Sequence, residues 1–137
     1  MATIRHQELS LRTGRRTEWV DITSRIRDIL SDTPVGDGVC TVASLHTTAG
    51  LTINENADPS VGRDFLHVLD RLVPRSDSAY RHAEGNSDSH VKASLVGFSA
   101  HVPFRDRQLV LGTWQSVYFC EFDGPRSRRV MVTVVGE

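Results

Sequence analysis

Three histidines stand among polar residues in separate parts of the 137-residue chain, at His46, His82 and His90. Neutral imidazole is the commonest protein ligand of first-row transition metals, and three imidazoles leave one coordination position open for water or a substrate. The residue types therefore favour a catalytic metal centre. The spacing leaves open that each histidine is an ordinary surface or core residue, because ligands from three elements must still converge. The remaining histidines are expected to be ordinary residues of strands and a helix: His6, His67 and His101.

Charged residues near these histidines could take part in the same chemistry. Glu55 follows the segment that contains His46, and Glu84 lies two residues after His82. Either carboxylate could act as a general base or orient an imidazole, and the alternative is a solvated loop carboxylate. Lys92, the only lysine, and Arg126 could bind an anionic substrate, since the arginine fork suits phosphate.

Residues 44–54 divide into two chemical faces if they are extended. The even positions carry polar or missing side chains, and the odd positions are mostly apolar. Because side chains alternate across a strand, one face would pack on a core and the other would present polar groups in a row. We therefore expect one strand whose polar face carries His46, Thr48 and Asn54. Whether this face binds a ligand or is only solvated stays open, although the charged residues usual on solvated faces are absent from it.

Three helices are expected around these sites. Thr23 can cap the first helix, and Asp58, followed by a proline at the first helical position, can cap the second. A polar loop then leads to a short third helix over residues 90–96, capped by Asp88 or Ser89. The second helix is expected to bury one stripe of apolar side chains: Val61, Phe65, Leu69 and Leu72.

The second half of the chain is rich in predicted strands. Besides the segment at 44–54, strands are expected at residues 4–11, 19–20, 98–104, 108–111, 114–122 and 128–135. The last strand is apolar on both faces, which predicts a central position in its sheet. Strands without regular helix alternation exclude a doubly wound parallel fold. The expected fold is a single α+β domain over residues 1–137, with a mostly antiparallel sheet or sandwich and about three helices.

Composition excludes several classes of function. With 39% hydrophobic and 24% charged residues, the chain is expected to be a soluble globular protein. A formal net charge of −1 gives no general field for nucleic acid or anionic lipid, so neither partner is expected. No apolar run approaches the roughly 20 residues of a membrane span, and no signal peptide is evident, which predicts a cytoplasmic location. Cys40 and Cys120 are expected to be buried free thiols.

Several of these residues lie in stretches that resemble one known family. The stretches are His46-Thr47-Thr48-Ala49-Gly50-Leu51-Thr52-Ile53-Asn54-Glu55-Asn56-Ala57-Asp58-Pro59, Glu84-Gly85-Asn86 with Ser89-His90-Val91-Lys92, and Leu111-Gly112-Thr113-Trp114-Gln115. They are similar to the YjbQ-type proteins, often labelled secondary thiamine-phosphate synthase. The resemblance extends over nearly the whole chain, from the first strand to Gly136.

The resemblance implies a compact α+β protomer that assembles into a homotrimer, with polar clusters near subunit boundaries and a metal held by histidines. Carried over residue by residue, it makes the metal ligands His46, His82 and His90. It places in a pocket Asn54, Glu55, Lys92, Thr113 and Gln115. Residue types and resemblance together give the catalytic candidates Glu55, Glu84 and Lys92. They give the substrate-binding candidates Thr48, Asn54, Thr113, Gln115 and Arg126.

The implied activity is weak thiamine phosphate synthesis, which joins a pyrimidine methyl diphosphate to a thiazole phosphate with loss of diphosphate. A divalent cation and Lys92 or Arg126 could stabilise the departing diphosphate. Three histidines favour zinc, whereas diphosphate chemistry favours magnesium. Two alternatives stay open: a metal-dependent hydrolase, and a non-catalytic trimeric module that binds a metabolite or a metal.

Overall fold

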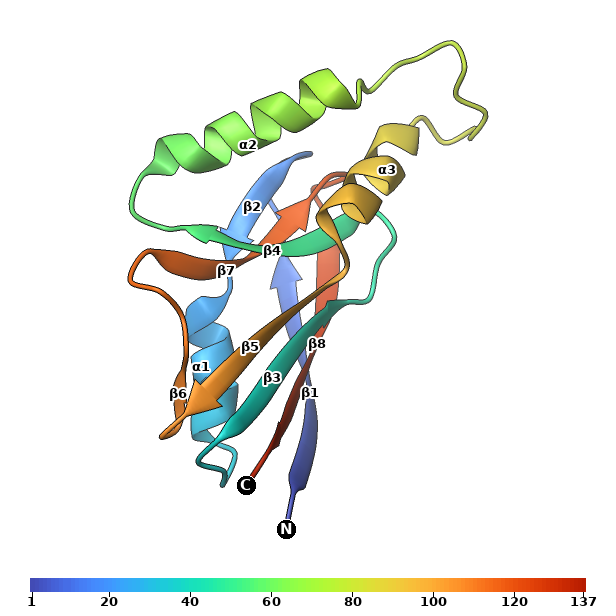
Figure 1. The fold of residues 1–137 in the computed structure, drawn as a ribbon. Helices are drawn as coiled ribbons and strands as arrows, with labels where there is room; N and C mark the ends of the chain where they lie inside the picture. The colour runs from blue at the N-terminus through green and yellow to red at the C-terminus, as the bar shows by residue number, and fades with distance from the viewer.

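The computed structural model describes residues 1–137 and contains eight strands and three helices. In chain order they are β1 (Thr3–Arg12), β2 (Glu18–Asp21), α1 (Thr23–Ser31), β3 (Gly38–Ser44), β4 (Ala49–Glu55), α2 (Pro59–Leu72), α3 (Ser87–Val96), β5 (Ser99–Arg105), β6 (Gln108–Leu109), β7 (Gln115–Glu121) and β8 (Ser127–Gly136). The expected α+β fold with three helices is confirmed (Figure 1). No helix has the length and apolar character that crossing a membrane requires.

The strands form two antiparallel sheets. One has five strands in the order β1-β8-β3-β5-β6, and the other has three in the order β2-β7-β4. β8 lies inside the larger sheet between β1 and β3, as its apolar sequence predicted. In β8 the side chains of Val130, Val132 and Val134 are buried, and the next residues along the strand point to the other face, where Val135 is exposed.

The main core lies between the two sheets and includes α1. Ile26 and Leu30 of α1 are buried in it together with Val132 of β8 and Phe119 of β7. α1 forms as predicted, but Thr23 does not cap it. Thr23 is the first helical residue, and its hydroxyl accepts a hydrogen bond from the backbone N–H of Val117 at 2.8 Å.

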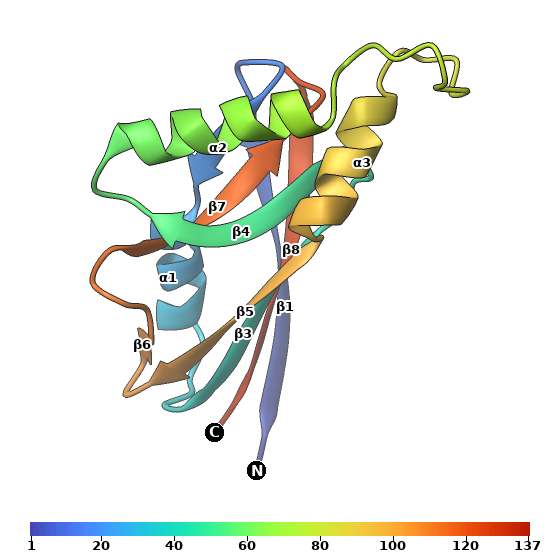
Figure 2. The ribbon, with the colours of Figure 1, turned by 45° about the horizontal axis from the view of Figure 1, so that its top comes forward.

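A second, smaller core lies between the three-stranded sheet and the helices α2 and α3, which cover it (Figure 2). Trp19 of β2 stacks on Tyr118 of β7, with ring centroids 4.0 Å apart, and on Phe65 of α2 at 5.3 Å. The predicted cap of α2 is confirmed, because the Asp58 carboxylate accepts from the backbone N–H of Ser60 at 2.9 Å. The predicted stripe of α2 is wrong at its end, where Leu72 is 70% exposed.

The single strand predicted over residues 44–54 is wrong. β3 ends at Ser44 in the five-stranded sheet, and β4 begins at Ala49 in the three-stranded sheet. Residues 45–48 turn between the two sheets, and the hydroxyl of Ser44 holds the turn by donating to the carbonyl of Ala49 at 2.8 Å. The apparent period of two therefore spans a turn. His46 therefore lies in the turn, whereas Asn54 lies at the far end of β4.

The third helix begins earlier than expected, at Ser87, with Asn86 at its cap position. Asp88 and Ser89, the predicted caps, lie inside its first turn and are buried. The loop from Val73 to Asn86 projects beyond α2 and α3 before the chain returns into α3 (Figure 1).

Gly62 sets the distance between α2 and the three-stranded sheet. A Cβ added at Gly62 would overlap the indole ring of Trp19, with its Cζ2 at 2.8 Å. We expect Gly62→Ala to destabilise the fold by about 1–3 kcal/mol, although alanine is the better helix former by about 1 kcal/mol. Urea unfolding measures the change. Gly14→Ala is the control, because nothing lies within 4 Å of a Cβ added at that position. A Gly62→Ala protein that is at least as stable as the parent contradicts this packing.

A candidate active-site cleft

A cleft of about 400 Å³ opens where the 45–48 turn, the start of α3 and the loop between β7 and β8 meet. Six residues proposed from the sequence line it: His46, Thr48, His82, Glu84, His90 and Arg126. Four more polar residues in its wall were not among the predicted site residues: Thr47, Asn86, Asp123 and Arg128. The structure thus brings the three predicted histidines into one cleft, as the hypothesis of a shared site requires.

The three histidines do not form an ion site as the side chains stand. His82 and His90 are neighbours, with ring centroids 5.1 Å apart in an edge-to-face arrangement. Glu84 approaches His82 only to 3.9 Å, between Oε1 and Nε2. No group of three or more His, Cys, Asp or Glu side chains in the chain is placed to hold a metal ion. The predicted three-histidine centre is therefore not formed, and metal binding stays a prediction.

His46 is held by the end of the larger sheet. Its Nε2 accepts a hydrogen bond from the backbone N–H of Arg129 at 2.8 Å, and its own backbone N–H donates to the hydroxyl of Ser44 at 3.3 Å. Burial lowers the pKa of the His46 imidazole, and the charges of Arg128 and Arg129 lower it further against the opposite effect of Glu121. His46 is therefore neutral at pH 7.

A buried ion pair forms the base of the cleft. The guanidinium of Arg128 donates from Nε to Oε1 of Glu121 at 2.8 Å and from Nη2 to Oε2, and both side chains are buried. The same Nη2 donates to the hydroxyl of Thr48 at 2.9 Å, which fixes the 45–48 turn. The sequence contained a signal that the side chain of Arg128 is buried, because it lies on the same face of β8 as the buried Val130 and Val132.

Asp123 organises the opposite wall. Its Oδ2 accepts from Nδ2 of Asn86 at 2.8 Å and from Nη2 of Arg126 at 2.8 Å, and its carbonyl accepts from Nε of Arg126. These bonds leave Nη1 of Arg126 without a protein partner, and its side chain is 52% exposed. Arg126 is thus the cation of the cleft that remains accessible to a ligand.

Lys92 does not reach the cleft, which corrects its proposed catalytic role. Its side chain is 1% exposed, and its Nζ lies 2.6 Å from Asp70 and 3.0 Å from Asp88. Asp88 also pairs with Arg16 at 3.1 Å, so the network joins α2, α3 and the loop before β2. Beside it, the hydroxyl of Ser89 donates to the carbonyl of Phe122. These contacts fix the first turn of α3, from which His90 enters the cleft.

The remaining predicted residues lie at the other end of the three-stranded sheet. Glu55 closes β4, six residues from Ala49 and thus about 20 Å from the cleft at roughly 3.3 Å per residue. Its carbonyl accepts from the hydroxyl of Tyr118 at 3.0 Å. None of these predicted residues lines the cleft of its own chain: Asn54, Glu55, Thr113 and Gln115. Gln115 instead accepts from the backbone N–H of Gly112 at 2.8 Å.

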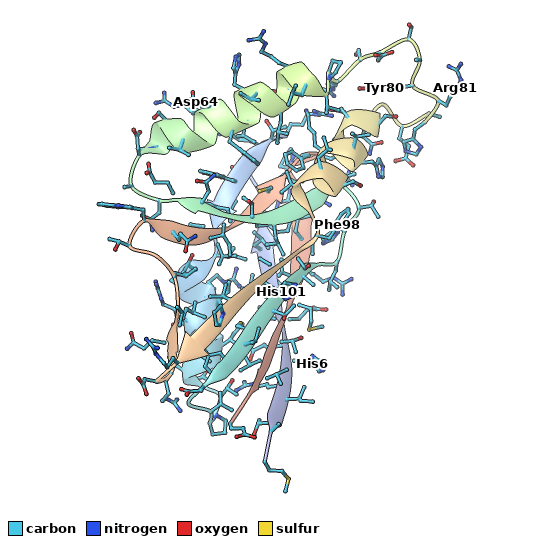
Figure 3. The ribbon with its side chains drawn as sticks, viewed as in Figure 1. His6, Asp64, Tyr80, Arg81, Phe98 and His101 are labelled. Atoms are coloured by element: carbon cyan, nitrogen blue, oxygen red, sulfur yellow. The ribbon has the colours of Figure 1, made fainter.

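The other histidines are ordinary surface residues, as expected. His6 and His101 lie on the five-stranded sheet, and both side chains are exposed (Figure 3). Each ring contacts a threonine hydroxyl through Nδ1, His6 with Thr133 at 2.8 Å and His101 with Thr41 at 3.1 Å. The two cysteines are buried and unpaired, also as expected.

Comparisons of the sequence with family models and with known proteins all match the same family. A family model described as UPF0047 protein YjbQ-like matches residues 7–137. The UPF0047 protein MJ1081 of Methanocaldococcus jannaschii is 47% identical over 127 residues, which cover 93% of this chain and 91% of that protein. The UPF0047 protein YugU of Bacillus subtilis is 45% identical, covering 93% of this chain and 97% of that one.

Two solved structures share the fold closely. An uncharacterised YjbQ/UPF0047 protein of Clostridium acetobutylicum matches with a TM-score of 0.91 at 48% identity, covering 93% of this chain and 98% of that one. A YbjQ-like protein of unknown function from Sulfolobus solfataricus matches with a TM-score of 0.95 at 29% identity, covering both chains completely. The likeness thus extends over the whole fold.

The buried network at α3 predicts a pH-dependent effect on stability. Burial would raise the pKa of the Asp88 carboxyl, but hydrogen bonds and charges of Arg16 and Lys92 outweigh it and hold the pKa below its ordinary 3.8. Ionised Asp88 therefore stabilises the fold above that pH, and the contribution is lost as the pH falls through the folded value. We expect Asp88→Asn to cost about 3 kcal/mol at pH 7 and less at pH 3, by at most about 1 kcal/mol, because the pH has then fallen only slightly below 3.8.

Urea unfolding at both pH values measures this difference. Asp64→Asn, an exposed position on α2 (Figure 3), is the matched control and is expected to change stability by less than about 0.5 kcal/mol. A destabilisation of Asp88→Asn that is equal at the two pH values would contradict the charge argument.

Proposed function

This chain belongs to the YjbQ-like UPF0047 family, and on that premise we propose that its histidine cleft binds a small phosphorylated molecule and acts on it as an enzyme. The observation that carries the proposal is the convergence of His46, His82 and His90 with an accessible arginine, Arg126, in one cleft. Histidines transfer protons near neutral pH, and a guanidinium N–H donates a charge-assisted hydrogen bond to a phosphate oxygen.

The free donor group of Arg126 supports an anionic ligand of modest size. Arg128 is neutralised by Glu121, and Lys92 by Asp70 and Asp88, so neither offers a free charge. Arg126 shares Asp123 but keeps Nη1 for a ligand oxygen. One accessible guanidinium in a cleft of about 400 Å³ suits a single phosphate or diphosphate group better than a polymer.

His82 and His90 are the proposed proton-transfer groups, with Glu84 beside His82. The candidate reaction is thiamine phosphate synthesis: the thiazole nitrogen bonds to the pyrimidine methylene carbon while the carbon–oxygen bond to diphosphate breaks. Arg126 would stabilise the charge that accumulates on diphosphate. Hydrolysis of a phosphate ester is the second candidate within this class. Zinc and magnesium enter the proposal as additions to the assay, because the side chains form no ion site as they stand.

We further propose that the protein is a homotrimer whose cleft is completed by the Glu55 end of a neighbouring subunit. Leu45, in the wall of the cleft, is exposed, and so are apolar side chains on α3 and just after it: Val91, Leu95 and Phe98. At the other end of the three-stranded sheet Trp114 is 60% exposed. It lies next to the amide of Gln115, which is opposite the carboxylate of Glu55 in the strand register. Apolar surface at both ends and opposite charge at Arg126 and Glu55 are complementary features that favour such contact.

A turnover screen tests the enzymatic proposal. Thiamine precursors and simple phosphate esters are offered with and without zinc or magnesium, and product is followed by phosphate and diphosphate release. We expect His90→Ala to lower kcat by about 100-fold or more, because general acid–base groups contribute roughly that factor. His67→Ala, on the exposed face of α2, is the control. Tight binding of these compounds with no product would replace the enzyme by a binding module.

Subunit mixing tests the shared site. If His90 and Glu55 of different subunits form one site, His90→Ala and Glu55→Gln proteins are each inactive, and a reassembled equal mixture regains about a quarter of the sites. Light scattering counts the subunits, and Leu95→Asp is expected to reduce the trimer to monomers. No recovery in mixtures that contain both subunits would overturn the shared site and leave the cleft of each chain to act alone.

A further inference from the structure

We propose that His46 is a fixed, neutral hydrogen-bond donor that holds an oxyanion of the ligand through its Nδ1–H, and not a metal ligand. The inference rests on the proposed function in one respect, the anionic character of the ligand. It goes beyond that function by assigning a tautomer and a contact to a single side chain.

The tautomer follows from the partner of Nε2. The backbone N–H of Arg129 lies 2.8 Å from Nε2, and a backbone amide can only donate. Nε2 must therefore present its lone pair. A neutral imidazole carries one ring proton, so this proton is on Nδ1. Protonation of both nitrogens would set two N–H groups against each other at this distance.

The geometry of the strands explains why His46 takes this position. β3 pairs with β8 only as far as Ser44, opposite Val130. The next residue of β8, Arg129, has no partner strand on this side, and the 45–48 turn supplies its partners instead. The backbone N–H of Leu45 donates to the carbonyl of Arg129 at 3.3 Å, and Nε2 of His46 accepts from the N–H of Arg129. The imidazole thus extends the sheet by one hydrogen bond.

The turn that carries His46 is fixed at both ends. Ser44 donates to the carbonyl of Ala49 at 2.8 Å, and Thr48 accepts from the buried guanidinium of Arg128 at 2.9 Å. The ring has little freedom to give up Arg129 for an ion. Metal coordination by Nδ1 would require loss of the proton on that nitrogen as well, because metal ligands must present a lone pair.

The charged groups that surround the ring favour its neutral form. Burial acts first, and the guanidiniums of Arg128, Arg129 and Arg126 act in the same direction, against the carboxylate of Glu121. Together these groups lower the pKa of His46 below its ordinary 6.5. Direct contact with a cation is unfavourable in these surroundings, whereas contact with an oxyanion is favourable.

The other ring nitrogen of His46, Nδ1, is free to donate a hydrogen bond to a ligand in the cleft. Nδ1 has no hydrogen-bond partner in the chain, and His46 lines the same cleft as Arg126. A phosphate oxygen accepts readily from a neutral N–H, and Arg126 can bind a second oxygen of the same group through Nη1. The ligand class is therefore an oxyanion, with phosphate as its simplest member.

Nitrogen-15 NMR of the imidazole rings tests the tautomer in the protein without ligand. We expect the Nδ1–H form for His46. Inorganic phosphate and diphosphate then serve as probes in binding titrations. His46→Ala is expected to weaken their binding by about ten-fold, the usual effect of losing one hydrogen bond to a charged group. His46→Asn is expected to restore most of it, because its amide N–H lies where Nδ1–H was.

Zinc titrations of the same variants separate this role from that of a ligand. We expect His46→Ala and His46→Asn to bind zinc as the control His67→Ala does. An Nε2–H tautomer, or a selective loss of zinc affinity in both His46 variants, overturns the donor role alone. Absence of phosphate and diphosphate binding in the parent protein overturns the anionic ligand, and with it the proposed function of the cleft.

Discussion

The buried ion pair between Arg128 and Glu121 is the contact on which the cleft depends. Two charges removed from water are stable only if nearly all their hydrogen-bonding groups have partners. Here Thr13 donates to Glu121 at 2.7 Å, the N–H of Asp123 donates to its second oxygen, and Thr48 accepts from Arg128. The pair therefore joins β7 of one sheet to β8 of the other and ties the connecting turn to both.

This constraint explains why the polar groups of the cleft occupy defined positions on loops. In the 45–48 turn, Thr48 accepts a hydrogen bond from the side chain of Arg128, and His46 accepts one from the backbone N–H of Arg129. His46 therefore has one orientation. The start of α3 is held by the separate network of Lys92 and Asp88. Loops positioned by a rigid scaffold are where binding residues concentrate, and here buried charges fix the 45–48 turn and the first turn of α3.

Local signals in the sequence predicted the parts of the fold that depend on neighbouring residues. Asp58 before a proline gave the start of α2, and the alternating valines of β8 gave an interior strand. Patterns that cross from one element to another failed, because residues 44–54 alternate in polarity across a turn between two sheets. Lys92 failed for a related reason. Asp88 stands four residues before it on α3, but the predicted helix began only at residue 90, and no spacing along the chain reveals the contact with Asp70 of α2.

The distribution of charge between structure and cleft limits the chemistry available to the protein. Arg16, Lys92 and Arg128 are all paired with internal carboxylates, and Arg126 is paired with Asp123, so the cleft can bind an anion only through the free Nη1 of Arg126 and through neutral donors. Neutral N–H groups bind an anion with little penalty when the anion leaves, whereas several free cations would retain it. A cleft built in this way favours exchange of a small anionic ligand over its storage. The same argument supports the proposal of an enzyme, which must release its product, over the alternative of a module that sequesters a metabolite.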